Sequence, residues 1–261
     1  SGLFYKKTLN KLKANKNIYF FTNKEDVNTE NSYVFNSVPK INSNENDLWQ
    51  HFGGYEIETD KNIFDDSIIN LMDFDCDQKN SVHFFYTLPF SKNKALIETT
   101  WLSNMKDPSE KDYDFQIKEY IENILKIKNY KIIYKEKGQI PLFYPTNLNG
   151  EKKINIGTAG KMTRLSTGYT FLNIQEHCKY IVKNLDSLKT YNIGKKYEIL
   201  DKIFLKVLKR NAKRMPNIFF EIFNSSAETS VKFLSNKSNI FQDLSIISKM
   251  PKWPFIKALF N

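Results

Sequence analysis

The chain has 261 residues, of which 41% are hydrophobic and 26% charged, so it can form a large core in one or two domains. Its net charge of +10 favours an anionic partner: a nucleic acid, a phosphate-bearing cofactor or a membrane surface. Cys76, Cys178 and three separated histidines lack metal-ligand spacing, which predicts no metal site and no disulfide and fits a reducing, cytoplasmic compartment. No apolar run reaches the roughly 18 residues of a membrane span.

The first 150 residues are predicted to be rich in strands. A short helix is expected at residues 5–13, and apolar runs predict strands at 18–21, 33–35, 51–59, 68–74, 83–90 and 95–101. Residues 112–127 have the apolar period of a helix, and a strand at 130–134 is followed by a predicted turn at 138–141.

The second part of the chain changes character near residue 151. A short strand at 153–156 leads through a glycine-rich loop into a helix at about 170–185, and residues 195–261 are predicted to be helical. Strands come first and helices last, with one strand–loop–helix unit between them. This order predicts an α+β or mixed α/β fold.

The glycine-rich loop "GTAGKMTRLSTGY" at 157–169 is a candidate anion site. Its glycines allow close backbone approach to a ligand, and a following helix N-terminus attracts negative charge. Ser166 or Thr167 could instead be a plain N-cap, and the loop is not a GxGxxG motif. The spacing alone therefore leaves a phosphate or flavin site and an ordinary helix cap both open.

Glu98 is the candidate catalytic residue, because it interrupts the strand "ALIETTW". Strand alternation places it on one face with Leu96 and Thr100, opposite Ala95, Ile97 and Trp101. A carboxyl group that faces a cavity has a raised pKa and can donate a proton, whereas one at a rim is an ordinary solvated glutamate. Other acids in or beside predicted strands compete for such a role: Glu56, Glu58, Asp73 and Glu136.

Residues 195–214 hold eight Lys or Arg residues against two acids, with apolar residues at helical spacing. A basic amphipathic helix suits an anionic membrane surface, although packing against the protein's own core uses the same pattern. The terminal segment "KMPKWPFIKALF" adds Trp253, Phe255 and Phe260 as a possible interfacial anchor. No nucleic-acid-binding module is recognisable, so nucleic acid is not the expected partner.

From about residue 33 onward, the order of motifs resembles the bacterial lycopene cyclases, which are FAD-dependent enzymes of carotenoid biosynthesis. The matching segments are "LWQHFGGYEIET" (48–59), "FD" (64–65), "LMDF" (71–74), "FFYTLPFS" (84–91), "ALIETT" (95–100), "GQIP" (138–141), "NIGTAGKMTRLSTGYTF" (155–171) and, near the end, "FLSN" and "DLSIISKMPKWPFIKALF".

The resemblance implies acid-catalysed, non-redox closure of lycopene ends into β-ionone rings, an isomerase-type reaction at a membrane surface. It implies reduced FAD as cofactor, maintained by NAD(P)H, on a two-domain flavoprotein scaffold. Glu98 inherits the role of proton donor or cation stabiliser. By the same resemblance, the loop residues expected to contact the flavin are Gly157, Thr158, Ala159, Gly160, Thr167 and Gly168.

This chain departs from the family pattern in several ways. Lys161 replaces a glycine, Leu165 replaces a proline, and Asp75 stands where the family usually has an arginine. The chain also begins Ser-Gly-Leu, and the Gly-rich N-terminal FAD-binding unit is not found in it, so we expect a carboxyl-terminal two-thirds of a cyclase.

Three regions are expected. Residues 1–150 are a sheet-rich, substrate-binding region with part of the flavin domain, residues 151–186 a flavin-facing strand, loop and helix, and residues 187–261 a helical C-terminal region. Two alternatives stay open at this point: a flavin-dependent monooxygenase or related oxidoreductase on the same scaffold, and an inactive membrane-peripheral binding fragment.

Overall fold

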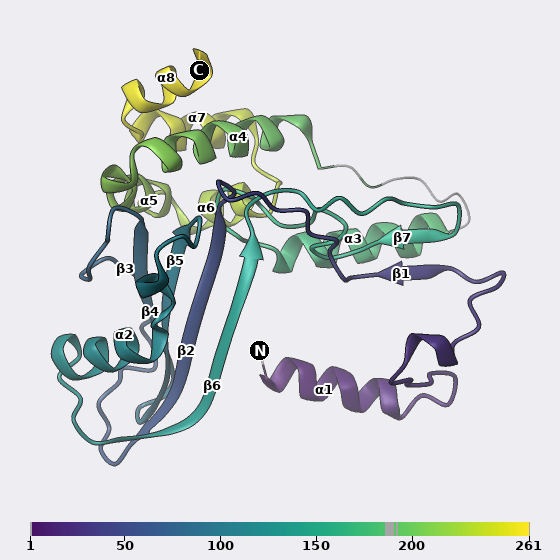
Figure 1. Cartoon of the computed structure of the whole chain (residues 1–261), viewed down its shortest axis with the longest axis horizontal. Helices are drawn as coiled ribbons and strands as arrows, with labels where there is room; N and C mark the ends of the chain where they lie inside the picture. The colour runs from purple at the N-terminus through teal and green to yellow at the C-terminus, as the bar shows by residue number, and fades with distance from the viewer. Residues whose placement is uncertain (1, 186–190, 192, 261) are drawn as a thin grey trace.

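A computed structural model describes residues 2–185, 191 and 193–260 of the chain. It has a mixed α/β architecture, in which a five-stranded sheet is joined to a bundle of C-terminal helices (Figure 1). The predicted fold class of sheet followed by helices is confirmed at this level. No helix among the described residues is long and apolar enough to cross a membrane.

The large sheet is antiparallel throughout and has the strand order β3-β4-β5-β2-β6. Its strands are β2 (Trp49–Thr59), β3 (Asn70–Asp73), β4 (Val82–Ser91), β5 (Lys94–Ser103) and β6 (Tyr130–Pro141). β2 lies between β5 and β6, so its pairing with each of them sets which residues of β5 and β6 lie in the same row.

One face of this sheet is covered by α2 (Tyr113–Glu119), which continues as a π-helical turn, η3 (Tyr120–Ile124). The alternation of strand side chains decides which residues meet this helix. A short 3₁₀ turn, η2 (Pro108–Lys111), precedes α2. The core on this face contains Tyr55, Ile57, Phe85, Ala95, Ile97, Ile117, Tyr120, Ile121 and Ile127.

The opposite face meets the helical bundle at one end of the sheet, shown at the top of Figure 1. The bundle comprises α4 (Lys195–Arg210), η5 (Ala212–Arg214), α5 (Met215–Phe223), α6 (Ala227–Leu234), α7 (Ile240–Lys249) and α8 (Lys252–Phe260). Val82, Phe84 and Leu102 of the sheet belong to the same buried core as Phe204, Val207 and Leu208 of α4. The apolar side of the basic helix therefore packs inside the protein.

A second, small sheet pairs β1 (Val34–Asn36) with β7 (Lys153–Asn155) in parallel. The glycine-rich loop follows β7 and leads into α3 (Phe171–Asn184). The N-terminal α1 (Gly2–Lys13) has no buried residue, and a short turn, η1 (Lys24–Asp26), lies between α1 and β1.

Three sequence-based expectations are corrected by the structure. Residues 18–21 form no strand, because they pair with no other segment and expose Tyr19, Phe20 and Phe21. The predicted turn at 138–141 is part of β6, which pairs with β2 as far as Pro141. The helix expected at 112–127 ends earlier, through the π-helical turn. The expected boundary between residues 186 and 187 lies outside the described residues.

Candidate active site

Glu98 lies in the middle of the large sheet, in a row of residues contributed by neighbouring strands. It is opposite Tyr86 of β4 on one side and Gly54 of β2 on the other. Gly54 is in turn opposite Glu136 of β6. The antiparallel register therefore places two carboxyl groups on the same face with a glycine between them.

The face that carries Glu98 is the one opposite α2. Ala95 and Ile97 point into the core beneath α2 and are fully buried, whereas Leu96 and Glu98 are partly exposed on the other side. This confirms the predicted alternation. On the same face, Phe84 and Tyr86 form an edge-to-face pair with ring centroids 5.2 Å apart.

The environment of Glu98 changes its acidity. Burial is the main influence and raises the pKa of its carboxyl group to about 7. The negative charge of Glu136 raises this pKa further, whereas the hydrogen bond from Thr100 Oγ1 to Glu98 Oε1 (2.8 Å) lowers it. Burial and the Glu98 charge also raise the pKa of Tyr86, so this phenol stays protonated. A carboxylic acid with a pKa near 7 is suited to donate a proton at neutral pH.

Gly54 leaves room for the Glu136 side chain between the two strands that carry the carboxyl groups. A Cβ atom on Gly54 would lie 3.2 Å from Glu136 Cγ and 3.4 Å from Glu136 Oε1. The Glu136 side chain therefore leans over Gly54 toward the strand that carries Glu98. At the next pair along these strands, Gly138 faces Phe52, whose ring occupies the space that a side chain at 138 would need.

The glycine-rich loop reaches the same face of the sheet. Gly168 has φ +69°, and a Cβ atom there would lie 2.0 Å from Gln50 Oε1. Gln50 is four residues before Gly54 on β2, a distance of about 13 Å along the strand, and its side chain is on the Glu98 face. The sequence predicts a catalytic role for Glu98 and a flavin contact for Gly168 without relating their positions. In the structure both lie on the same face of the sheet.

The loop is tied to the helical bundle by a buried ion pair that sequence reasoning missed. Arg164 Nη2 lies 2.8 Å from Asp201 Oδ1 of α4, and its Nη1 donates to the Phe233 carbonyl at the end of α6. Asp201 also accepts hydrogen bonds from the Leu165 amide and the Ser166 hydroxyl. The spacing of Asp201 with Tyr197, Phe204 and Leu208 on one helical stripe would have indicated a buried acid.

The helix-cap interpretation of Ser166 and Thr167 is wrong. α3 begins at Phe171 with Thr170 at its N-cap, and no side chain accepts a hydrogen bond there. Ser166 instead donates to Asp201, and Thr167 Oγ1 accepts from the Tyr169 amide at 3.4 Å. The first N–H groups of α3 therefore have no side-chain acceptor and could bind an anion.

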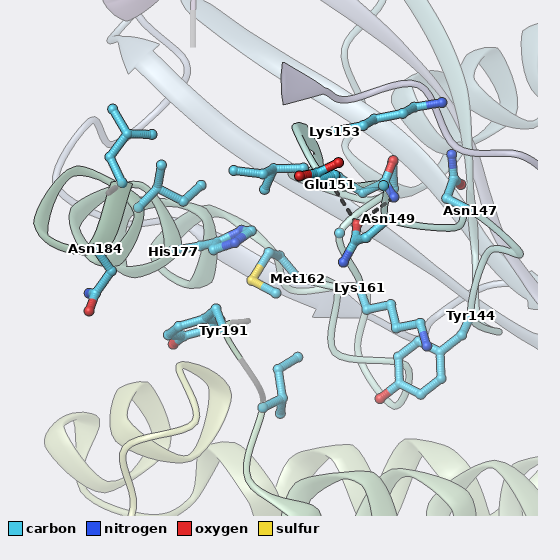
Figure 2. Close-up of a pocket in the computed structure, with 18 of the residues that line it drawn as sticks. Tyr144, Asn147, Asn149, Glu151, Lys153, Lys161, Met162, His177, Asn184 and Tyr191 are labelled. Atoms are coloured by element: carbon cyan, nitrogen blue, oxygen red, sulfur yellow. Dashed lines mark hydrogen bonds between the residues drawn. The ribbon is translucent and has the colours of Figure 1, made fainter. Parts of the chain in front are cut away.

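A polar cavity of about 450 Å³ lies behind the loop (Figure 2). Ala159 and Gly160 line it, together with β7 and one side of α3. A Cβ atom on Gly160 would lie 2.4 Å from the Asn155 carbonyl oxygen, so only glycine fits this close approach. His177 of α3 is buried beside the cavity with its Nδ1 atom unpartnered. Gly157, Thr158, Thr167 and Glu98 do not line this cavity.

Two of the departures noted in the sequence have structural consequences. Lys161 has φ +64°, a backbone conformation that glycine adopts without strain, and its Nζ atom lies 5.3 Å from the Tyr144 ring centroid. Leu165 is buried, and its amide donates to Asp201. A proline at 165 would lack that donor. Asp75 borders a separate cavity on the α2 side of the sheet, away from the Glu98 face.

The other candidate acids have distinct surroundings. Glu58 forms an ion pair with Lys94 at 3.3 Å, and Asp73 accepts a hydrogen bond from the Tyr120 hydroxyl at 2.6 Å. Glu56 is opposite Leu96, one pair beyond the Glu98 row. Of these acids, Glu136 alone shares that row. Among the described residues, no group of three or more His, Cys, Asp or Glu is placed to hold a metal ion.

The first prediction concerns the buried ion pair. Asp201→Asn leaves the Arg164 guanidinium buried without its counter-charge, so we expect the free energy of unfolding to fall by about 3–5 kcal/mol. Glu228→Gln, which breaks an exposed ion pair with Lys232, should change it by less than about 1 kcal/mol. Urea denaturation measures both, and equal effects of the two substitutions would contradict the structural role of Asp201.

The second prediction concerns the strained loop residue. Lys161→Gly should increase the free energy of unfolding by about 1 kcal/mol, because it relieves a left-handed backbone conformation. Lys202→Gly, at an exposed position inside α4, is the matched control and should lower it by about 1 kcal/mol. The same sign for both variants in urea denaturation would refute the assignment of strain to Lys161.

The chain is similar in structure to a geranylgeranyl bacteriochlorophyll reductase-like protein from Thermoplasma acidophilum. The two align with a TM-score of 0.42 and 16% identity, covering 84% of this chain and 56% of that one. Apo VirX1 aligns with a TM-score of 0.35 and 13% identity, covering 83% and 38%. The chain thus spans a little over half the length of the first protein and less than half the length of the second. No curated protein matches it. The sequence model of the lycopene cyclase protein family matches residues 3–259, nearly the whole chain, which therefore belongs to the lycopene cyclase family.

Proposed function

We propose that the protein containing this chain cyclises the ends of lycopene to β-ionone rings by acid catalysis, without net oxidation or reduction. The observation that carries the proposal is Glu98, a half-buried carboxyl group with a pKa of about 7 on an open sheet face, in a member of the lycopene cyclase family. A family of this kind acts on an apolar polyene, and on this face the partly buried Leu96 and Tyr86 are the apolar and aromatic neighbours of Glu98.

In this proposal Glu98 starts the reaction. Its carboxyl proton adds to the terminal double bond of lycopene, which leaves a tertiary carbocation. The neighbouring double bond of the substrate closes onto that cation and forms the ring bond. Loss of a ring proton then gives the new double bond, so one proton enters, one leaves, and the product is an isomer of the substrate.

The residues present fit a flavin at the glycine-rich loop. The start of α3 has no side-chain cap, and Gly168 places the loop backbone on the Glu98 face. Gly157, Thr158, Ala159, Gly160, Thr167 and Gly168 would hold the cofactor, and N–H groups at the start of α3 would favour an anionic form of it. When bound, reduced FAD maintained by NAD(P)H supplies negative charge that stabilises a carbocation.

A peripheral membrane position would give access to the substrate. The apolar side of α4 is inside the core, so the surface candidates are α7 and α8. Phe241, Leu244, Trp253 and Phe260 on these helices are more than half exposed, and α8 also carries Lys252 and Lys257. Exposed aromatic residues beside lysines suit the interface of an anionic membrane.

Removal of the proposed acid is the direct test. Glu98→Gln keeps the size of the side chain and removes its proton, so ring formation should fall at least about 100-fold. The measurement is chromatography of carotenoids from lycopene-accumulating bacteria that express the full-length gene. Glu58→Gln, on the same face but paired with Lys94, is the control and should form rings as the unmodified protein does. Unmodified protein that forms no cyclic product would refute the proposed function.

The pH dependence supplies a separate test. Glu98 must be protonated to act, and its pKa is raised to about 7, so the acid form predominates below that value. The specificity constant kcat/KM for cyclisation should be level near pH 6 and fall tenfold per pH unit above about pH 8. The titratable groups in the row of Glu98 are Tyr86 of the adjacent strand β4 and Glu136 of β6, on the far side of Gly54. A rate that rises with pH through this range would show that the ionised carboxylate is the active form.

A further inference from the structure

Ring closure requires a second proton transfer that Glu98 alone does not explain. After Glu98 has donated its proton, a ring proton must leave the cyclised cation. The position from which it leaves fixes the position of the new double bond. A group beside Glu98 that can accept this proton would therefore determine the ring type.

We propose that Glu136 is a second catalytic carboxyl group, the base that removes the ring proton. This inference rests on the proposed cyclisation and assigns a role that the family match does not give. Glu136 occupies the same row as Glu98, with Gly54 between them. Two strand spacings separate the backbones by about 10 Å, and the Glu136 side chain leans over Gly54 into that interval.

The surroundings of Glu136 suit a proton acceptor. Its side chain is half-exposed, so solvent can stabilise the carboxylate and exchange its proton. Among the described residues, no hydrogen-bond donor or cation is paired with its carboxylate in the way that Lys94 is paired with Glu58. Its charge is one of the influences that raise the pKa of Glu98. The two carboxyl groups thus differ in their contacts: Glu98 accepts a hydrogen bond from Thr100, and Glu136 has no such partner among the described residues.

The proton balance of the cycle is complete. Glu98 gives its proton to the substrate and becomes a carboxylate, and Glu136 takes the ring proton and becomes a carboxylic acid. After product release, Glu136 loses its proton to solvent and Glu98 regains one. No oxidant or reductant enters the step. Because position 54 has no side chain, the Glu136 side chain lies over it, and a substrate end placed against Glu98 and Glu136 would contact both carboxyl groups.

The test is to replace Glu136 and identify the ring type of the products. Glu136→Gln should reduce β-ring formation by at least about 10-fold and shift the remaining rings to isomers with the double bond elsewhere. Glu136→Asp keeps a carboxylate and should restore β-ring formation in part. Glu56→Gln, on the same face one pair away, is the matched control and should leave rate and ring type unchanged. Chromatography of carotenoids from the same lycopene-accumulating cells measures all of these variants.

The outcomes separate this inference from the proposed function. If unmodified protein forms β-rings and Glu136→Gln forms them at the same rate, the role of Glu136 is refuted while the proposed function stands. A slower reaction with an unchanged ring type would also overturn the assignment, because it would show that Glu136 only positions or polarises Glu98. Loss of rings in Glu136→Asp as well as Glu136→Gln, with both variants folded by circular dichroism, would overturn it too, because a carboxylate at 136 would then be insufficient.

Discussion

The pairing of β2 with β5 on one side and β6 on the other is the constraint on which the candidate site depends. A shift of one residue in either register would move Glu98 or Glu136 to the face beneath α2. The buried residues of β5 resist such a shift, because Ala95 and Ile97 fill the core under that helix. The packing on one face of the sheet therefore determines which side chains lie on the other.

The helical bundle affects the site because it binds the glycine-rich loop. Arg164 is buried between the rings of Tyr197 and Phe233, with its guanidinium carbon 5.0 Å and 4.9 Å from their centroids. It binds Asp201 of α4, and the same acid accepts from the loop backbone at Leu165. The bundle thus determines where the loop can lie relative to the sheet, although none of its helices carries a proposed catalytic residue.

The sequence predicted much of the sheet and the face of Glu98, because alternating side chains and β-branched runs determine both. It missed the end of β6, since Gly138 and Pro141 have the composition of a turn. The structure explains Gly138 differently: its missing side chain accommodates the ring of Phe52 on the neighbouring strand. Long-range contacts of this kind leave no local pattern. For the ion pair of Arg164 with Asp201, the helical stripe of α4 indicates a buried acid but not its partner, which is 37 residues away in the chain.

The glycine at position 54 determines how closely the Glu136 side chain can approach the strand that carries Glu98. A larger side chain there would crowd Glu136 and Leu96, whose atoms already lie 3.2 Å from where its Cβ would be. It would also force the Glu136 side chain away from its position over the strand. A glycine at the centre of a strand destabilises it, because glycine has no side chain to pack and loses more backbone entropy on folding than other residues. Gly54 is paired on both sides by long strands, and these ladders supply the stability that the residue itself does not. β2 can therefore lack a side chain at the one point where the Glu136 side chain reaches toward the strand of Glu98.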